Sequence, residues 1–259
     1  MKLSIITINL NNKEGLKKTI SSVRSQTFTD FEYILIDGGS TDGSCDVMNE
    51  HAAAFSNYVS EPDRGIYHAM NKGIALAKSE YLLFLNSGDF FLDEDILDKI
   101  APDLGSADIV YGDLSIAHKG KYKNKVYPNV LTFSYFIGNS IGHPATFIKK
   151  SLFDRVGTYD ENMRICADWA FFIRAIGLFN ASYKHVPVTV AVFGTDGISC
   201  LAQNRQLMRN EQINLLKNDF SFFETDYESY QELKDNMESL RRSGPYKFLK
   251  FLGLPKYQT

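Results

Sequence analysis

The amino-acid sequence predicts an α/β fold: a mostly parallel central sheet flanked by helices and followed by a C-terminal helical extension. Three observations lead to this prediction. Short apolar strands alternate with helical stretches as far as residue 111, hydrophobic residues make up 44% of the 259 residues, and no apolar run reaches the roughly 18 residues of a membrane span. A chain of this length can form one large domain or two small ones, each with its own core.

The strands of the first half are short apolar or β-branched runs, and the helices carry apolar residues on one face. The predicted strands are Leu3–Ile8, Phe31–Ile36, Tyr58–Ser60, Tyr81–Leu85 and Asp108–Tyr111. The predicted helices are Glu14–Gln26, Asp46–Ala54, Tyr67–Lys78 and Glu94–Ile100. Because strands and helices alternate, we expect parallel strands covered by helices on both faces.

The second half of the chain is less regular. The segment from Gly112 to Gly142 has no clear periodicity and is rich in lysine and aromatic residues. Beyond it we predict a strand, a helix and a last strand, over Ala145–Lys149, Asp168–Ile176 and Val186–Phe193. The chain is helical after Cys200, and one helix there carries an apolar stripe made of Tyr227, Tyr230, Leu233, Met237 and Leu240.

Charge and cysteine content exclude several classes of protein. With 28 Lys and Arg against 31 Asp and Glu the net charge is −3, so the chain does not simply coat nucleic acid, and we expect no nucleic-acid partner. The three cysteines (Cys45, Cys166 and Cys200) are far apart and form no CxxC pair, as in a reduced cytoplasmic protein without disulfides or a zinc site. The N-terminal segment passes directly into a strand, so we expect no signal peptide.

Ligands of open α/β sheets bind at the carboxyl ends of the strands, and polar residues follow the predicted strands there. The first group lies in YILIDGGSTDGS, residues 33–44. Its Asp37 can accept hydrogen bonds from a nucleobase or a ribose, although an ordinary strand–turn–helix connection would use the same residue types. No GxGxxG follows a strand and no GxxxxGK[ST] occurs, which disfavours dehydrogenases and P-loop NTPases.

The second group spans residues 60–89, where Asp63-Arg64-Gly65 opens a helix and the following strand ends in Asn-Ser-Gly-Asp. The helix start and the strand end should face the same crevice. A carboxylate such as Asp89 repels a diphosphate unless a hard divalent cation bridges the two, so Asp89 suggests Mg²⁺ or Mn²⁺. The alternative is that Asp89 only caps the next helix.

The third group spans residues 142–174. Asp168 opens an aromatic helix that contains Trp169, and a carboxylate at such a helix N-terminus suits a general base. An N-cap aspartate above a core-facing aromatic stripe is the alternative. His143 precedes a strand and would by itself more often be structural than catalytic.

Taken together, these segments resemble the family 2 glycosyltransferases, which have the GT-A nucleotide-sugar-binding fold, and in particular bacterial enzymes that build polysaccharides and lipid-linked glycans. The resemblance runs from Leu3 to about Ser199 and rests on SIITINLNN, IDGGSTDGS, SEPDRGIYHAMNKGIALA, FLNSGD and the later His-Pro, Asp-Glu and Ala-Asp-Trp series, in that order. It implies a glycosyltransferase domain over residues 1–199, with a nucleotide-sugar half (1–111) and an acceptor half (112–199), and a helical extension over 200–259.

The resemblance also implies roles for single residues. Asp168 would be the catalytic base, Asp89 the metal-facing carboxylate, and His143 and Trp169 would lie on the acceptor side. The loop Gly194–Ser199 would close over the donor. The nucleotide-sugar-binding residues would be Thr7, Asn9, Asn11, Asp37, Asp63, Arg64, Lys72, Asn86 and Ser87. The family usually has more acidic residues where this chain has Asn86-Ser87-Gly88-Asp89, so we expect weak metal binding that the diphosphate completes.

The implied activity is a metal-dependent, inverting transfer of a sugar from a nucleoside-diphosphate sugar, by default a UDP-sugar, to a glycan or polyprenyl-linked acceptor. Two alternatives remain. A sugar-phosphate nucleotidylyltransferase would have a glycine-rich loop where this chain has Asn9-Leu10-Asn11-Asn12. An inactive nucleotide-sugar-binding protein would not need both Asp89 and Asp168.

The C-terminal tail is basic. From Arg241 to Thr259 there are five basic residues and no acidic one, and aromatic and leucine residues alternate with lysines. This composition suits peripheral contact of residues 241–256 with an anionic membrane surface. Docking of the terminal helix on its own domain, or homodimer formation through the stripe from Tyr227 to Leu240, would explain the same pattern.

Overall fold

The computed structural model describes residues 1–118, 120–195 and 197–253, and the chain forms two compact units, Met1–Glu211 and Gln212–Thr259. The first unit ends at Glu211, and the domain boundary at residue 199 stays a prediction. The division of that unit into a donor and an acceptor half stays a prediction. Asp196 and Lys256, which belong to the predicted closing loop and basic tail, lie outside the described residues.

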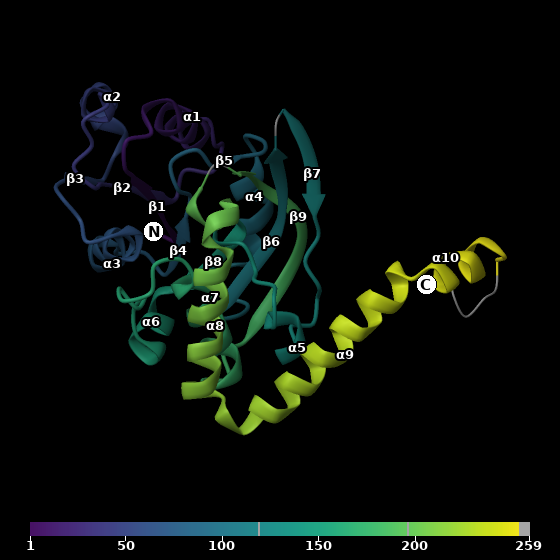
Figure 1. The fold of residues 1–259 in the computed structure, drawn as a ribbon. Helices are drawn as coiled ribbons and strands as arrows, with labels where there is room; N and C mark the ends of the chain where they lie inside the picture. Colours follow the sequence, from purple (N-terminus) through teal and green to yellow (C-terminus); the bar gives the residue numbers. More distant parts are fainter. Residues whose placement is uncertain (119, 196, 254–259) are drawn as a thin grey trace. The chain divides into compact units, whose positions relative to one another are not determined.

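The first unit begins with the predicted parallel strands (Figure 1). They lie in the order β3-β2-β1-β4, and every neighbouring pair among them is parallel. The strands are β1 (Leu3–Asn9), β2 (Phe31–Asp37), β3 (Asn57–Ser60) and β4 (Tyr81–Phe84). The helices between them are α1 (Lys13–Arg24), α2 (Ser44–Glu50) and α3 (Ile66–Leu76). The α/β class is confirmed, with elements within a few residues of their predicted ranges.

The rest of the sheet is mixed, so the expectation of a mostly parallel sheet is right only for the first half. β8 pairs antiparallel with both β4 and β6, β6 pairs parallel with β9, and β5 pairs antiparallel with β9. These strands are β5 (Phe90–Phe91), β6 (Ile109–His118), β8 (Thr146–Lys149) and β9 (Tyr183–Gly194). The remaining helices of this unit are α4 (Ile96–Ile100), α5 (Phe133–Phe136), α6 (Lys150–Val156) and α7 (Ala167–Gly177).

The segment from Gly112 to Gly142 is more regular than expected. β6 continues to His118 and turns back into β7 (Lys121–Lys125), which pairs antiparallel with it. All five residues of β7 are exposed. Because the strand buries no face, its sequence lacks the apolar alternation by which strands are recognised, and this explains why the hairpin was missed.

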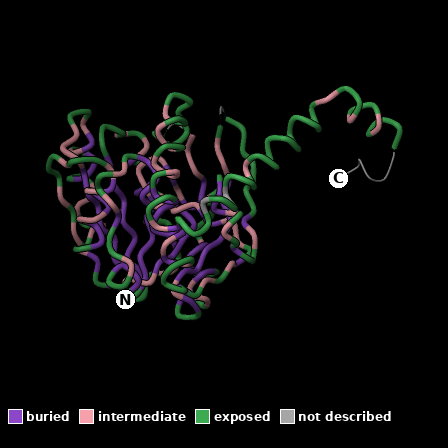
Figure 2. The backbone as a smooth tube through the Cα atoms, turned by 60° about the horizontal axis from the view of Figure 1, so that its bottom comes forward, coloured by how far each residue is buried: buried purple, intermediate pink, exposed green. Residues whose placement is uncertain are grey.

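The core of the first unit lies around the two central strands. Every residue of β1 and β4 is buried, and α1 packs Leu16, Ile20 and Val23 inward. Figure 2 shows these strands as buried, while most of α9 and α10 is exposed. Burial on both faces explains why these strands are mostly apolar, as is usual for strands of parallel sheets. The strands end in polar residues, which places Asn9 and Asp37 side by side in the register.

The second unit is helical. α8 (Arg205–Asp219) runs across the boundary, and α9 (Glu224–Arg242) and α10 (Gly244–Phe251) follow. Short 3-10 turns occur at residues 52–54, 101–103, 143–145, 198–200, 202–204 and 221–223. Among the described helices, none combines the length and the apolar content needed to cross a membrane.

Candidate active site

The carboxyl ends of β1 and β2 are joined by Asp37. Its Oδ1 accepts hydrogen bonds from Asn9 Nδ2 (2.7 Å) and Ser40 Oγ (2.5 Å). Its Oδ2 accepts from the main-chain N–H groups of Gly39 and Ser40 and from Ser60 Oγ, at 3.1, 2.9 and 2.7 Å. Burial alone would raise the pKa of Asp37, but these hydrogen bonds hold it below its ordinary value. The buried carboxylate therefore fixes the glycine-rich turn.

Two residues of the predicted donor site are buried in this arrangement. Asp37 is 0% exposed with both oxygens occupied, and Thr7 is 0% exposed with its hydroxyl donating to the Leu85 carbonyl at 2.7 Å. Each side chain satisfies buried polar groups of the fold, and its role in donor binding stays a prediction. Asn9 is also buried, but its Oδ1 has no partner within the described part of the chain.

The space next to Asp37 is taken by Asp63. An ideal Cβ added to Gly38 would collide with Asp63 Oδ2. Asp63 Oδ1 accepts a hydrogen bond from the Gly65 N–H at 2.9 Å, whereas Oδ2 accepts none from the residues that the structure describes. Asp63 thus supplies the carboxylate that has a free oxygen near the end of β2. Its carboxylate can occupy this position because residue 38 has no side chain.

The loop after β1 connects this turn to the turn after β4. The Asn11 main-chain N–H donates to Ser40 Oγ at 2.7 Å, and Asn11 Oδ1 accepts from the Thr41 N–H at 2.8 Å. On the other side, Asn12 Nδ2 donates to the Ser87 carbonyl at 2.9 Å and Ser87 Oγ donates to the Asn12 carbonyl at 3.2 Å. Asn11 is exposed and has a left-handed φ of 49°, a conformation that asparagine tolerates.

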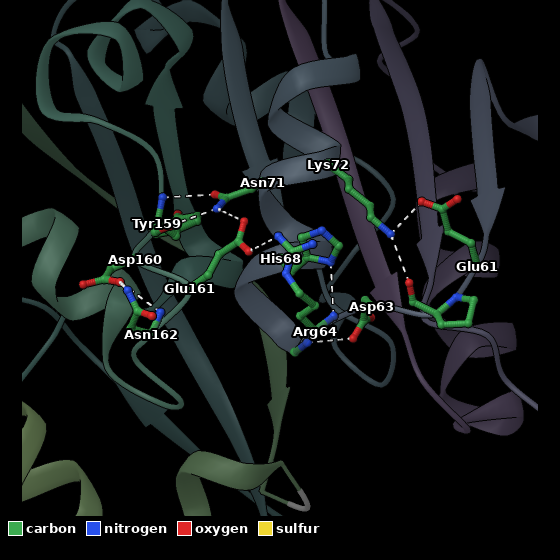
Figure 3. A network of polar contacts seen from close by, with 12 residues as sticks. Glu61, Asp63, Arg64, His68, Asn71, Lys72, Tyr159, Asp160, Glu161 and Asn162 are labelled. Atoms are coloured by element: carbon green, nitrogen blue, oxygen red, sulfur yellow. Dashed lines mark hydrogen bonds and ion pairs between the residues drawn. The ribbon is translucent and has the colours of Figure 1, made fainter.

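The predicted diphosphate cations are paired with glutamates (Figure 3). Arg64 Nη2 lies 2.6 Å from Glu161 Oε2, and Lys72 Nζ lies 2.7 Å from Glu61 Oε1. Asn71 donates a hydrogen bond to the other oxygen of Glu161 at 3.1 Å. The Arg64 side chain is 71% exposed, so water screens its pair and the guanidinium can move to an anionic ligand at low cost.

Asp89 ends the Asn-Ser-Gly-Asp turn and is 6% exposed. Its main-chain N–H donates to the Asn86 carbonyl at 2.9 Å, and its Oδ1 accepts from the Gly194 N–H at 3.0 Å. Burial raises the pKa of Asp89 to about 6, an effect that the nearby His143 and the Gly194 N–H partly offset. The hydrogen bond from Gly194 ties the predicted closing loop to this carboxylate.

His143 lies between Asp89 and Asp168. Its Nε2 is 3.8 Å from Asp89 Oδ2 and 3.0 Å from Asn86 Nδ2, and its Nδ1 is 3.4 Å from Asp168 Oδ2. Burial would lower the pKa of His143, but the hydrogen bond to Asp168 and the charges of both carboxylates raise it overall. One imidazole therefore contacts the predicted metal carboxylate and the predicted base.

Asp168 lies in the first turn of α7. Its Oδ1 accepts the Trp169 main-chain N–H at 2.8 Å and lies 3.2 Å from the Tyr67 hydroxyl, which also donates to the Ile165 carbonyl at 2.5 Å. Tyr67, on α3, was not among the predicted site residues. A tyrosine within a helical pattern carries no sequence signal for this contact.

The N-terminus of α7 is held by Glu211, a second residue that sequence reasoning missed. The carboxylate accepts hydrogen bonds from the main-chain N–H groups of Arg164 (2.6 Å), Ile165 (3.2 Å) and Cys166 (3.0 Å). Cys166, at the N-cap, supplies no side-chain hydrogen bond to the helix N–H groups itself. Glu211 thus satisfies main-chain N–H groups of the segment that leads into α7 and of its N-cap, and a negative charge near a helix start is favourable.

Trp169, which is predicted to lie on the acceptor side, is buried, and its role there stays a prediction. It is 3% exposed, and its indole N–H donates to the Phe136 carbonyl at 2.8 Å. Tryptophan buried in this way contributes apolar area and satisfies its single polar atom inside the protein. Trp169 forms part of the core against which α7, the helix that carries Asp168, packs.

The residues present fit a partial divalent-metal site. Asp89 Oδ2 accepts no hydrogen bond, and Asn86 Oδ1 is buried without a partner, among the residues described. Hard oxygen donors of this kind suit Mg²⁺ and Mn²⁺. In residues 1–118, 120–195 and 197–253 no group of three His, Cys, Asp or Glu side chains could hold a metal ion. Asp89 and Asn86 are thus the oxygen donors that the described residues place here.

The structure brings some of the predicted residues together and keeps others apart. Asn86, Asp89, His143 and Asp168 form one contiguous cluster. Within the described parts of the chain, no hydrogen bond or ion pair joins Asp37 directly to this cluster, and the loop from Asn9 to Asn12 connects the two.

Comparisons with known proteins agree with this geometry. A family model described as glycosyl transferase family 2 matches residues 4–175. The chain is 33% identical over 201 residues to a PGL/p-HBAD biosynthesis glycosyltransferase of Mycobacterium bovis BCG, covering 75% of this chain and 77% of that protein. It is also 33% identical over 181 residues to an uncharacterized glycosyltransferase of Mycobacterium tuberculosis, covering 67% of this chain and 68% of that one.

Two solved structures share the fold at low sequence identity. S. aureus TarS 1–349 in complex with UDP-GlcNAc superposes with a TM-score of 0.66 at 18% identity, covering 83% of this chain and 67% of that one. The mannosyltransferase PcManGT from Pyrobaculum calidifontis, in complex with GDP-Man and Mn²⁺, gives a TM-score of 0.59 at 13% identity, covering 96% of this chain and 82% of the other. The chain spans only 40% of the length of a longer TarS chain. These likenesses confirm the predicted GT-A fold.

Proposed function

The chain belongs to glycosyl transferase family 2, and we propose that it is an inverting enzyme that moves a sugar from a nucleoside-diphosphate sugar to a hydroxyl of a glycan or lipid-linked acceptor. The observation that carries the proposal is the convergence of Asp89 and Asp168 on His143, at 3.8 and 3.4 Å. Asp89, on the donor side, and Asp168, the proposed base, both lie next to the His143 imidazole. Carboxylates in these positions can act on the leaving group and on the attacking hydroxyl of a single displacement.

In this reaction Asp168 accepts the proton of the acceptor hydroxyl, whose oxygen attacks the anomeric carbon from the side opposite the leaving diphosphate. The bond from that carbon to the diphosphate breaks, and the configuration inverts. Arg64 and Lys72 stabilise the charge that grows on the leaving group once the donor draws them from Glu161 and Glu61. No second carboxylate is needed as a nucleophile, in contrast to retaining glycosidases.

The donor we propose is a UDP-sugar, bound at the carboxyl ends of β1, β2 and β4. The neighbouring TarS structure that holds UDP-GlcNAc supports this choice. Asp63 offers its free oxygen to the nucleoside, while Asn9, Asn11, Asn86 and Ser87 line the turns beside it. We assign residues 1–111 to donor binding and 112–199 to the acceptor.

We include Mn²⁺ or Mg²⁺ in the proposal, held by Asp89 with the Asn86 side chain beside it and completed by the donor diphosphate. A bound divalent ion acts as a Lewis acid toward the leaving diphosphate. The Mn²⁺ in the PcManGT complex supports the choice of metal. Because the described residues supply few metal ligands, we expect the affinity for the metal to be low without UDP and higher with it.

We propose a cytoplasmic location with peripheral contact to an anionic membrane surface, where lipid-linked acceptors are found. The free cysteines Cys45, Cys166 and Cys200 support a reducing compartment. In α10 the apolar residues Phe248 and Phe251 are 62% and 85% exposed beside two lysines. Basic residues near anionic headgroups contribute about 1 kcal/mol each. Equal sedimentation of the full chain and a chain ending at Ser243 with anionic vesicles would contradict this contact.

We also propose that α9 can pair two copies of the chain. Tyr230, Leu233, Met237 and Leu240 are exposed at helical spacing on this helix. Sedimentation velocity on the full chain and on a Leu233→Glu, Met237→Glu variant tests the dimer. A wild-type monomer at all concentrations would contradict it.

Two measurements test the main proposal. UDP-, GDP- and dTDP-sugars are compared by thermal shift, since a ligand that binds only the folded state raises its stability. Nucleoside diphosphate release with Mn²⁺ and octyl glycoside acceptors is then measured for wild type and Asp168→Asn. We expect a loss of about 10²- to 10⁴-fold in kcat for the variant with unchanged UDP affinity. Unchanged turnover would remove Asp168 from its role.

A further inference from the structure

We propose that His143 is a positioning residue: it holds the Asp168 carboxylate in the orientation needed for proton transfer and ties that carboxylate to the donor-side turn Asn86–Asp89. The inference rests on the proposed function and deepens it, because it gives a role to the residue between the two halves of the site.

The contacts of Asp168 divide between its two oxygens. Oδ1 is held by the Trp169 main-chain N–H at 2.8 Å and lies 3.2 Å from the Tyr67 hydroxyl. Oδ2 faces His143 Nδ1 at 3.4 Å and contacts no other group among the described residues. His143 therefore decides where Oδ2 points. One of its lone pairs is occupied by the imidazole, and the other is left for the acceptor hydroxyl.

The other ring nitrogen contacts the donor-side turn. Nε2 lies 3.0 Å from Asn86 Nδ2 and 3.8 Å from Asp89 Oδ2. With the proton on Nδ1, toward Asp168, Nε2 is the acceptor for the Asn86 amide. The two ends of the ring thus contact residues of the turn after β4 and of α7, which are distant in the sequence.

The ring has little freedom to turn. The His143 side chain is 17% exposed and packs edge-on against the Phe193 ring, with centroids 6.3 Å apart and planes at 87°. Phe193 directly precedes Gly194, whose N–H holds Asp89. A packed ring with both nitrogens engaged is the kind of support that keeps a reacting carboxylate within the narrow range that catalysis requires.

Two conservative variants test the contacts of Nδ1 and Nε2 separately. An asparagine at position 143 places an amide nitrogen near the position of Nδ1 and can still donate to Asp168. A glutamine places its amide near Nε2, where it can contact Asn86 but not orient Asp168. If His143 positions the base, His143→Asn should retain more kcat than His143→Gln.

The experiment uses the full chain, UDP as the binding probe, and UDP-sugars with octyl glycosides for transfer. We expect kcat to fall by about 100-fold in His143→Ala and His143→Gln and by about tenfold in His143→Asn, in line with the cost of misplacing a catalytic group. The Kd for UDP in the absence of metal should match that of wild type in all three. In the Asp168→Asn background, His143→Gln should cause no further loss, because there is no base left to orient.

The results distinguish this inference from the proposed function. Equal kcat in the Asn and Gln variants, or wild-type kcat in His143→Ala, overturns the positioning role while transfer by the wild type stands. Additive losses in the double variant overturn it as well, since they would mean that His143 acts apart from Asp168. A wild-type chain that releases no diphosphate from any sugar nucleotide contradicts the proposed function and the inference with it.

Discussion

The carboxylate of Asp63 occupies the space that a side chain at Gly38 would need. A Cβ at position 38 would collide with Asp63 Oδ2, while the main chain there is not in the left-handed region that excludes other residues. The shape of the turn therefore permits a side chain, and the Asp63 carboxylate opposes it most strongly, with Leu10 Cδ1 also close at 3.2 Å. The missing side chain at position 38 and the free oxygen of Asp63 are two parts of one feature.

Gly38→Ala should displace Asp63 and weaken donor binding. Because the loss concerns a ground-state contact, we expect the Kd for UDP to rise by about tenfold, the value of one lost hydrogen bond, with little change in kcat. Isothermal titration with UDP checks this. Gly244→Ala is the matched control, since a Cβ there meets nothing within 4 Å. Wild-type UDP affinity in Gly38→Ala would exclude Asp63 from the donor site.

Glu161→Gln should release Arg64 for the donor. The pair at 2.6 Å involves a 71% exposed arginine, so its removal should change the free energy of unfolding by less than about 1 kcal/mol. The amide oxygen of the introduced glutamine can still accept the hydrogen bond from Asn71. We expect tighter UDP binding at low salt and a smaller gain at high salt, because screening weakens the charge contact. A UDP Kd equal to that of wild type at both salt concentrations would show that Glu161 does not compete for Arg64.

Glu211→Gln should loosen the start of α7 and disturb Asp168 in its first turn. The amide has one acceptor oxygen where the carboxylate has two, so at least one N–H of residues 164–166 loses its partner. We expect a loss of about 1–2 kcal/mol in the free energy of unfolding, with a lower kcat. Urea denaturation and steady-state kinetics measure the two effects. Glu228→Gln, on the exposed surface of α9, is the control. Wild-type stability in Glu211→Gln would contradict the capping role.

Glu32 should make the stability of the fold depend on pH. It is 1% exposed, and its Oε1 accepts hydrogen bonds from the Ser4 hydroxyl and from the main-chain N–H groups of Lys78 and Ser79. Burial alone would raise its pKa, but these hydrogen bonds lower it below 4.5. A lowered pKa in the folded state means that the ionised group stabilises the fold above pH 4.5, and that this stabilisation is lost as the pH falls through the folded-state pKa.

Glu32→Gln should therefore lower the free energy of unfolding at pH 7 by about 1–3 kcal/mol, with a difference from wild type that shrinks below pH 4.5. Urea denaturation at a series of pH values measures this. Glu50→Gln, exposed on α2, should leave both the stability and its pH dependence as in wild type. A pH-independent difference between Glu32→Gln and wild type would contradict the assigned linkage.

Buried strands were predicted accurately from the sequence, and an exposed strand was not. The strands β1, β2 and β4 were predicted within a few residues because each is an apolar run whose composition reflects burial on both faces. The exposed hairpin strand β7 was missed because nothing in a run of lysines marks it as a strand. The mixed pairing of the second half was not predicted, because apolar periodicity identifies strands but not the direction in which they pair.

The sequence by itself determined the fold class and the family. Motifs that follow one another at strand ends are local features, and they can be recognised in a single sequence. Only the tertiary structure decided which polar atoms are free. It enclosed Asp37 and Thr7 among partners, buried Trp169, set His143 between Asp89 and Asp168, and brought Glu211 to the start of α7. The reason is physical: whether a polar atom is available depends on how neighbours from distant segments bury it and bond to it, and residue type and spacing do not contain that information.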